Sequence, residues 1–181
     1  MLNFKVDIDK SIQATLFVLK EVGGTCDFHK IFKVLYFADQ KHLARFGRPI
    51  TGDNYIAMKN GPVPSNIYDI LKSIRNETVF SDFAKQYITF FDVRMNHFAI
   101  AKQDPDLEYL AETELECLKE AILENKDLNF NQLTEKSHDG AYDKAVKDDY
   151  IPLLEIAKVG GANEAMLNYI QLNVQNQRAL Q

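Results

Sequence analysis

Residues 28–39 of this chain read FHKIFKVLYFAD, a run in which apolar side chains occupy nearly every face of a helix. The run predicts a helix from Phe28 to about Arg45, and a helix that is apolar all round belongs in the middle of a core. Before it, apolar residues at helical spacing predict a helix over residues 9–20 that ends at Gly23-Gly24. The expected fold is therefore built around the second helix.

A short strand is expected over residues 55–59, after the turn residues that follow the central helix. Asn60-Gly61-Pro62 ends this strand. A lone glycine before a proline does not make a phosphate-binding loop. We interpret it as a sharp strand-to-helix corner, in which Gly61 supplies an unusual φ and Pro62 fixes the next one. A helix over residues 65–74 follows.

The rest of the chain alternates between β-rich runs and helical patterns. Runs at residues 87–93 and 97–101 predict a hairpin, which we expect to join residues 55–59 in one small sheet. The other elements predicted, in chain order, are a loop over 76–85, helices over 113–125, 131–137 and 142–147, an extended linker at 151–154, a hinge at Gly160-Gly161 and a last helix over 163–175.

These elements predict a mainly α fold with a small antiparallel β element, an α+β class, in a single compact helical domain. With 181 residues, of which 46% are hydrophobic, the chain is long enough to bury its own core. We expect the domain to span residues 1–150. Residues 151–181 are expected to form a linker and a helix that pack on this domain or extend it.

Composition narrows the classes of function. The formal net charge is −5, from 26 acidic and 21 basic residues, and the acid concentrates between Asp104 and Glu124. General nucleic-acid binding relies on clustered Lys and Arg, so this balance argues against it. Cys26 and Cys117 lie in contexts that suit buried free thiols in a reducing cytoplasm. Without a signal-peptide pattern or a membrane-spanning run, we expect a cytoplasmic chain with no membrane partner.

Candidate chemistry is sparse. Asp39 and His42 are spaced to share one helix face, as metal ligation or acid–base work requires, but a local ion pair or cap explains the spacing equally well. The four histidines lack zinc-site spacing and there is no CxxC, so we expect neither a metal nor a cofactor. We expect no enzyme activity. A hydrolase using Asp39, His42 or His138, or a cysteine paired with a histidine in the fold, stays an alternative.

A winged-helix DNA reader is the second alternative, because three helices followed by a hairpin share its outline. The helix that would enter the major groove offers Lys72 and Arg75 to phosphate, with Asp69 opposing them. Nucleic acid therefore ranks behind protein as the expected partner, although the sequence keeps DNA binding as an alternative.

Several motifs in the first half of the chain occur in a distinctive order. The first is a Leu-Tyr-x-Ala-Asp motif that lies within the central helix and whose last residue is Asp39. The others are an Ile-Thr-Gly-Asp turn at residues 50–53 and Gly61-Pro62-Val63 before Ile67-Tyr68. In this order and spacing they resemble the signature of the Panacea domain family, the SocA-like antitoxins and GepA-like phage-associated proteins. The segment from Leu133 to His138 is similar to a later motif of that family, with Tyr142 where a Trp is usual.

The resemblance implies a mostly helical domain with a small β element and no enzyme activity. It further implies an antitoxin that neutralises a cognate toxin protein by direct binding, with a protease such as ClpXP as a further partner if the domain acts as an adaptor. We expect Tyr36 and Asp39 to brace the Gly-Pro-Val corner by hydrogen bonding. An acidic helix over residues 112–124 suits a basic toxin surface. The candidate partner-binding or motif residues are Tyr36, Asp39, Thr51, Gly52, Asp53, Gly61, Pro62, Val63, Tyr68 and His138.

Overall fold

The computed structural model describes residues 2–75 and 85–179. The loop predicted over residues 76–85 lies almost entirely outside these described residues. Within them, seven α-helices and two small antiparallel sheets surround one hydrophobic core, so the predicted mainly α, α+β class is confirmed. No helix in this described part of the chain is long and apolar enough to cross a membrane.

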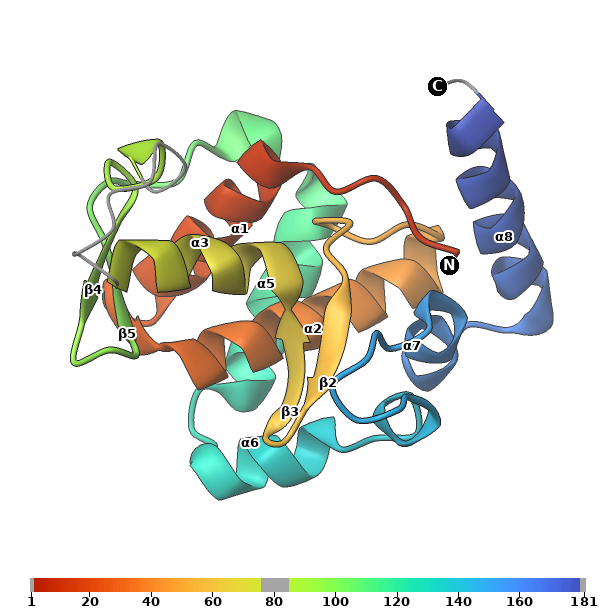
Figure 1. Ribbon diagram of the computed structural model, residues 1–181. Coiled ribbons are helices and arrows are strands. Elements are labelled where there is room, and N and C mark those ends of the chain that lie inside the picture. The colour runs from red at the N-terminus through yellow and green to blue at the C-terminus, as the bar shows by residue number, and fades with distance from the viewer. Residues whose placement is uncertain (1, 76–84, 180–181) are drawn as a thin grey trace.

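Helix α2 (Phe28–Phe46) runs through the centre of the fold (Figure 1). It begins where the Asp27 carboxylate accepts the Lys30 N–H at 3.0 Å. It ends at Gly47, which has a φ of 70° and donates its N–H to the Leu43 carbonyl at 3.0 Å. The central helix predicted from the apolar run is therefore confirmed, and local capping sets both of its ends.

Other helices pack around α2. Those in contact with it are α1 (Ile8–Glu21), α5 (Glu112–Asn125), α6 (Phe130–Ser137) and α7 (Leu153–Val159). Helix α3 (Ser65–Arg75) contacts α1, and two 3₁₀ turns, η1 (Leu107–Tyr109) and η2 (Tyr142–Lys144), join the later segments. The helices predicted over residues 9–20, 65–74, 113–125 and 131–137 are confirmed, whereas the one predicted over 142–147 is only the 3₁₀ turn η2.

A three-stranded antiparallel sheet lies at one end of α2, in the order β1-β5-β4. Its hairpin, β4 (Phe91–Arg94) and β5 (Phe98–Ala101), is the one predicted from the β-rich runs. Strand β1 (Thr25–Asp27) joins α1 to α2 and pairs with β5, with Cys26 opposite Ala99. The predicted hairpin is thus confirmed, although its third strand is β1 and not the strand near residue 55.

The second sheet is the hairpin of β2 (Tyr55–Met58) and β3 (Gly61–Pro64). The single sheet expected from the sequence is therefore wrong, and so is the interpretation of Gly61-Pro62-Val63 as a simple corner. The prolines at 62 and 64 alternate with Gly61 and Val63, which keep their backbone N–H groups. This alternation lets a proline-rich segment form a short strand.

The C-terminal segments belong to the same hydrophobic core. Leu153 and Leu154, predicted as linker, begin helix α7, because a proline at position 152 precedes the helix and starts it without breaking its hydrogen bonds. Helix α8 (Glu164–Ala179) confirms the predicted last helix and buries Ile170 and Val174 in the core. Its residue Gln177 accepts a hydrogen bond from the N-terminal segment, and Figure 1 shows the N-terminus beside α8.

Candidate functional site

The buried Asp39 carboxylate fastens the loop after α2 to the helix. It accepts hydrogen bonds from the Ile50 N–H at 2.6 Å, the Thr51 hydroxyl at 3.1 Å and the Tyr55 hydroxyl at 2.8 Å. Burial raises the pKa of Asp39 to about 6, although these donors oppose the shift. We call Asp39, Ile50, Thr51 and Tyr55 the Asp39 cluster. It is a brace of the fold, because its charge is surrounded by donors from its own chain.

The next two motif residues, Gly52 and Asp53, lie in the chain between α2 and α3. Gly52 has a φ of 70°, and a Cβ there would lie 2.5 Å from the Lys5 carbonyl oxygen, so glycine alone fits without a shift. Asp53 caps α3, since its carboxylate accepts the backbone N–H groups of Asn66 and Ile67, each at 3.1 Å. Asp53 therefore positions α3, while Gly52 lets the chain pass close to the N-terminal segment.

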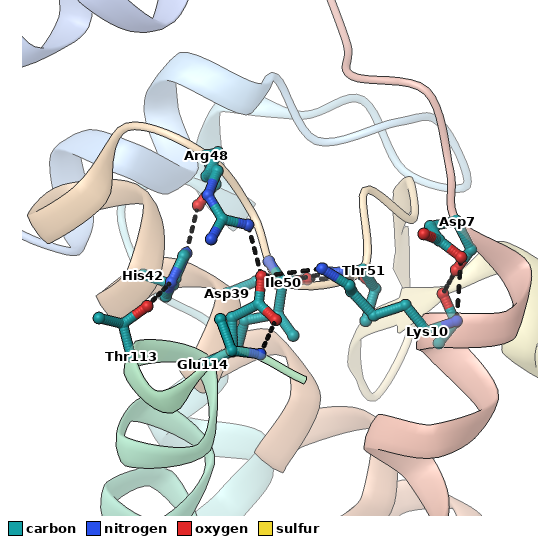
Figure 2. Close-up of polar contacts among 11 residues, drawn as sticks. Asp7, Lys10, Asp39, His42, Arg48, Ile50, Thr51, Thr113 and Glu114 are labelled. Carbon is teal, nitrogen blue, oxygen red and sulfur yellow. Dashed lines mark hydrogen bonds and ion pairs between the residues drawn. The ribbon is translucent and has the colours of Figure 1, made fainter. Parts of the chain in front are cut away.

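His42 and Asp39 lie one helical turn apart, but their hydrogen bonds go to different residues (Figure 2). His42 Nδ1 lies 2.7 Å from the Arg48 carbonyl oxygen, and its Nε2 lies 3.2 Å from Thr113 Oγ1. Burial lowers the pKa of His42, which favours the neutral ring. Each residue therefore holds structure through its own partners, and the local ion pair considered for their spacing is not what they form.

Much of the acid on α5 is paired within the chain. Glu114 is buried beside α1, where Figure 2 shows it between Lys10 and Arg48. Among the described residues, the ion pairs of this helix are Glu114 with Lys10 and Arg48, Glu120 with Lys41 and Arg45, and Glu124 with Lys41 and Lys136. Glu116 is exposed. The acidic helix expected to meet a toxin thus directs several of its charges inward, toward its own scaffold.

Tyr36 also contacts a different element from the one expected. Its hydroxyl donates to Asp139 at 3.1 Å, and the Gln40 amide donates to the same carboxylate at 2.6 Å. This contact fixes the segment after α6 to α2. The expectation that Tyr36 and Asp39 brace the Gly-Pro-Val segment is therefore wrong; Lys33 does so, by donating to the Pro62 carbonyl at 2.9 Å.

A groove of about 680 Å³ lies beside the N-terminal half of α2. Its walls come from α2, the β2–β3 hairpin, α3, the β4–β5 turn and the chain between α5 and α6. Apolar side chains dominate the lining, among them Phe28, Phe32, Phe98, Leu128, Phe130 and Leu133. We call this the α2 groove. Its size and apolar lining are those of a binding site.

Lys33 lines the α2 groove and is only 1% exposed. Burial lowers the pKa of its ammonium to about 7. A Cβ on Gly61, which also lines the groove, would collide with Ser137 Oγ and lie 3.2 Å from Lys33 Nζ. Glycine at this position therefore leaves room for the end of the buried Lys33 side chain.

A second ionisable group, His29, lines the groove one turn before Lys33. Its ring stacks on Phe130 with centroids 4.0 Å apart, and its Nε2 lies 3.0 Å from Thr134 Oγ1. Burial and the charge of Lys33 lower the pKa of His29 to about 4. The ring is therefore neutral at pH 7, and it contributes aromatic surface to the groove.

The two cysteines are buried, whereas His138 is exposed and stacks on an aromatic ring. Cys26 and Cys117 are both buried free thiols, as predicted, and burial raises the pKa of Cys26 to about 12. His138 is exposed and stacks on Tyr142 with ring centroids 4.1 Å apart. Tyr142 in turn donates its hydroxyl to the Met58 carbonyl at 3.0 Å, which ties η2 to the β2–β3 hairpin.

The ten predicted site residues thus divide into a groove group, a group that braces the fold, and His138. Gly61, Val63 and Tyr68 line the α2 groove, and Pro62 supplies the carbonyl that Lys33 binds. The group that braces the fold consists of Tyr36, Asp39, Thr51, Gly52 and Asp53, while His138 lies outside the groove on an exposed surface. The structure brings Gly61, Val63 and Tyr68 together in the lining of one groove, which the remaining motif residues do not line.

Sequence reasoning missed Lys33, although a signal is present. The helix around it is apolar on nearly every face, and the positions three and four residues away hold His29, Lys30, Tyr36 and Phe37. None of these can supply a carboxylate at helical spacing. A lysine in that setting is either buried without a local partner or reaches toward a site.

Comparison with known families supports the resemblance. A family model described as "Antitoxin SocA-like, Panacea domain" matches residues 31–141, which hold α2 from its first turn onward, most of the residues that line the α2 groove and the later Leu133–His138 motif. The chain belongs to this family. Neither the curated proteins nor the solved structures yield a match to it.

Proposed function

We propose that this chain is an antitoxin that neutralises a cognate toxin by binding it directly, without catalysis. Family membership supports the antitoxin class. The observation that carries direct binding is the α2 groove, since it is an apolar site of about 680 Å³ whose lining lies mostly within the residues that the family model matches. Proteins bind through such apolar concavities when aromatic side chains are grouped at their centre.

A non-catalytic role agrees with the state of the candidate catalytic groups. The Cys26 thiol is buried, with a raised pKa, and is therefore a poor nucleophile. The Asp39 carboxylate is occupied by donors from the loop after α2, and His42 is held between Arg48 and Thr113. These contacts account for the polar residues without a substrate.

Co-expression tests the proposal. Candidate toxins encoded beside this chain are expressed alone and with it, and growth and co-purification are measured. We expect one of them to stop growth alone, to be tolerated in the presence of this chain, and to co-purify with it. A complete survey of adjacent genes that yields neither rescue nor a complex would contradict the proposal.

The adaptor role is a finer form of the same proposal, in which the bound toxin is delivered to a protease such as ClpXP. It predicts that the half-life of the toxin shortens when this chain is present and that deleting the protease restores the half-life. A toxin that is neutralised but not degraded supports direct binding alone.

DNA binding remains the second candidate, because one observation favours it. Helices α1 to α3 are followed by the β4–β5 hairpin, with β1 alongside β5, which fits the outline of a winged-helix domain. The exposed positions of α3 include Asp69 as well as Lys72, and Arg75 donates to the Asn96 carbonyl of the hairpin at 3.2 Å. A shift of promoter DNA at low salt, lost at higher salt, would support this function, and its absence would exclude it.

A further inference from the structure

The buried ammonium of Lys33 is incompletely satisfied by its own chain. It donates to the Pro62 carbonyl at 2.9 Å, and among the described residues no carboxylate lies within ion-pair distance of it. An ammonium has three donor hydrogens, so two remain available. Burying such a charge without a counter-ion costs free energy, and proteins ordinarily pair it. Lys33 is therefore a buried amine with unused donor hydrogens, and the carboxylate of Asp27 acts on it without forming an ion pair.

The position of Lys33 fits an external partner. Lys33 lines the α2 groove although it is only 1% exposed, and its Nζ atom lies beside Gly61, where a side chain would crowd it. The groove is also lined by other elements, including Leu128 between α5 and α6 and Phe130 at the start of α6. A ligand in the groove therefore meets apolar surface and this ammonium together.

The charged side chains that line the groove are mostly positive. Its described lining includes Lys30, Lys33 and Lys59, while its one carboxylate is Asp27, whose oxygen already caps α2. This local excess of positive charge occurs in a chain with a net charge of −5. The groove is therefore complementary to a negatively charged group, in contrast to the acidic α5 surface.

We propose that the α2 groove binds a segment of the partner protein in which one Asp or Glu side chain, flanked by apolar side chains, pairs with Lys33. The inference rests on the proposed function, because it takes the partner to be a protein. The carboxylate would accept the free donors of Lys33, and its apolar neighbours would cover Phe28, Phe32 and Phe98. A volume of about 680 Å³ exceeds what one carboxylate side chain fills, which is why the apolar flanks are part of the assignment.

Peptide selection tests the assignment without knowledge of the toxin. A displayed library of random 12-residue peptides is selected on the full chain, on Lys33→Met and on Lys59→Met. The last variant is the matched control, because Lys59 is an exposed lysine at the rim of the same groove. We expect peptides from the wild-type chain and from Lys59→Met to share an acidic residue between apolar residues, and peptides from Lys33→Met to lack it.

The affinity of one selected peptide is then measured by fluorescence anisotropy. Its Asp→Asn or Glu→Gln version should bind the wild-type chain at least tenfold more weakly, a test that leaves the protein unchanged. Lys33→Met should weaken the acidic peptide by a similar factor and Lys59→Met by less than threefold. Failure to enrich any peptide, enrichment without an acidic position, or equal binding of the acid and amide peptides would each overturn the assignment.

The two proposals can fail separately. If acidic peptides bind as described but no adjacent protein is neutralised, the antitoxin function fails and the ligand assignment stands. If a toxin is neutralised equally by the wild-type chain and by Lys33→Met, and the peptides show no acidic position, the ligand assignment alone is overturned.

Discussion

The Asp39 cluster and the α2 groove place two buried charges on the same helix in opposite circumstances. Asp39 accepts hydrogen bonds from Ile50 and Thr51 in the loop that follows α2 and from Tyr55 of β2, so its charge is satisfied within the fold. Lys33 donates one hydrogen bond and lines an apolar groove. Burial alone therefore does not distinguish a structural charge from one that binds a ligand. The two differ in the number of hydrogen-bond partners that their own chain supplies.

Removing the satisfied charge should have the largest effect. Asp39→Ala leaves the Ile50 N–H and the hydroxyls of Thr51 and Tyr55 without their acceptor, so we expect a loss of about 3 kcal/mol in the free energy of unfolding. Urea denaturation measures it. A loss below about 1 kcal/mol would show that the loop finds other partners, and Asp39 would then not differ from Lys33 in the way described.

Adding a methyl group at the groove should have the next largest effect. Gly61→Ala places a Cβ against Ser137 and Lys33 at a φ of 97°, so we expect a loss of about 2–3 kcal/mol and weaker binding of toxin. Gly23→Ala is the matched control, because Gly23 has a φ of 95° but no atom within 4 Å of the added carbon. Equal losses in the two variants would mean that backbone strain, and not contact with Lys33, explains the requirement for glycine.

Removing the unsatisfied charge should raise stability. We expect Lys33→Met to gain about 1–2 kcal/mol below pH 7 while losing partner binding. The pKa of Lys33 is about 7 in the folded chain against 10.5 for an ordinary lysine, so between these values the unfolded wild-type chain binds the proton that the folded chain has released. Wild-type stability therefore rises through this range.

The advantage of Lys33→Met should accordingly be greatest below pH 7 and should decrease as the pH rises from 7 toward 10.5. Urea denaturation at several pH values measures it, with Lys59→Met as the exposed control. A stability gain that does not change with pH would indicate that packing, and not the charge, accounts for the difference.

Changes on the acidic helix should have the smallest effects on folding. Glu120→Gln removes the partner of Arg45, which we expect to cost about 0.5 kcal/mol because the pair is solvent-exposed. Glu116→Gln affects an exposed residue and should leave the unfolding midpoint unchanged. Titration calorimetry with the toxin tests whether it binds the acidic face of α5 or the α2 groove. A larger loss of toxin affinity for Glu116→Gln than for Lys33→Met would favour α5.

Local signals explain which elements could be predicted. The central helix follows from its apolar run and from caps a few residues away, such as Asp27 with Lys30. The errors arose where a local signal has two meanings. Prolines at 62 and 64 read as a corner but alternate with donors in strand β3, and Pro152 reads as a linker but starts α7. Strand β1 was missed because its three residues pair with β5, far along the chain.

The sequence by itself determined the helical framework and the family motifs of this protein, because helical periodicity, capping and motif order are all local properties of the chain. It also named Gly61, Val63 and Tyr68, which line the groove. Whether a buried charge braces the fold or lines the groove is visible only in the tertiary structure. The partners of buried groups come from distant segments, as when Tyr36 contacts Asp139, and a residue's own neighbours in sequence cannot show whether such a partner arrives.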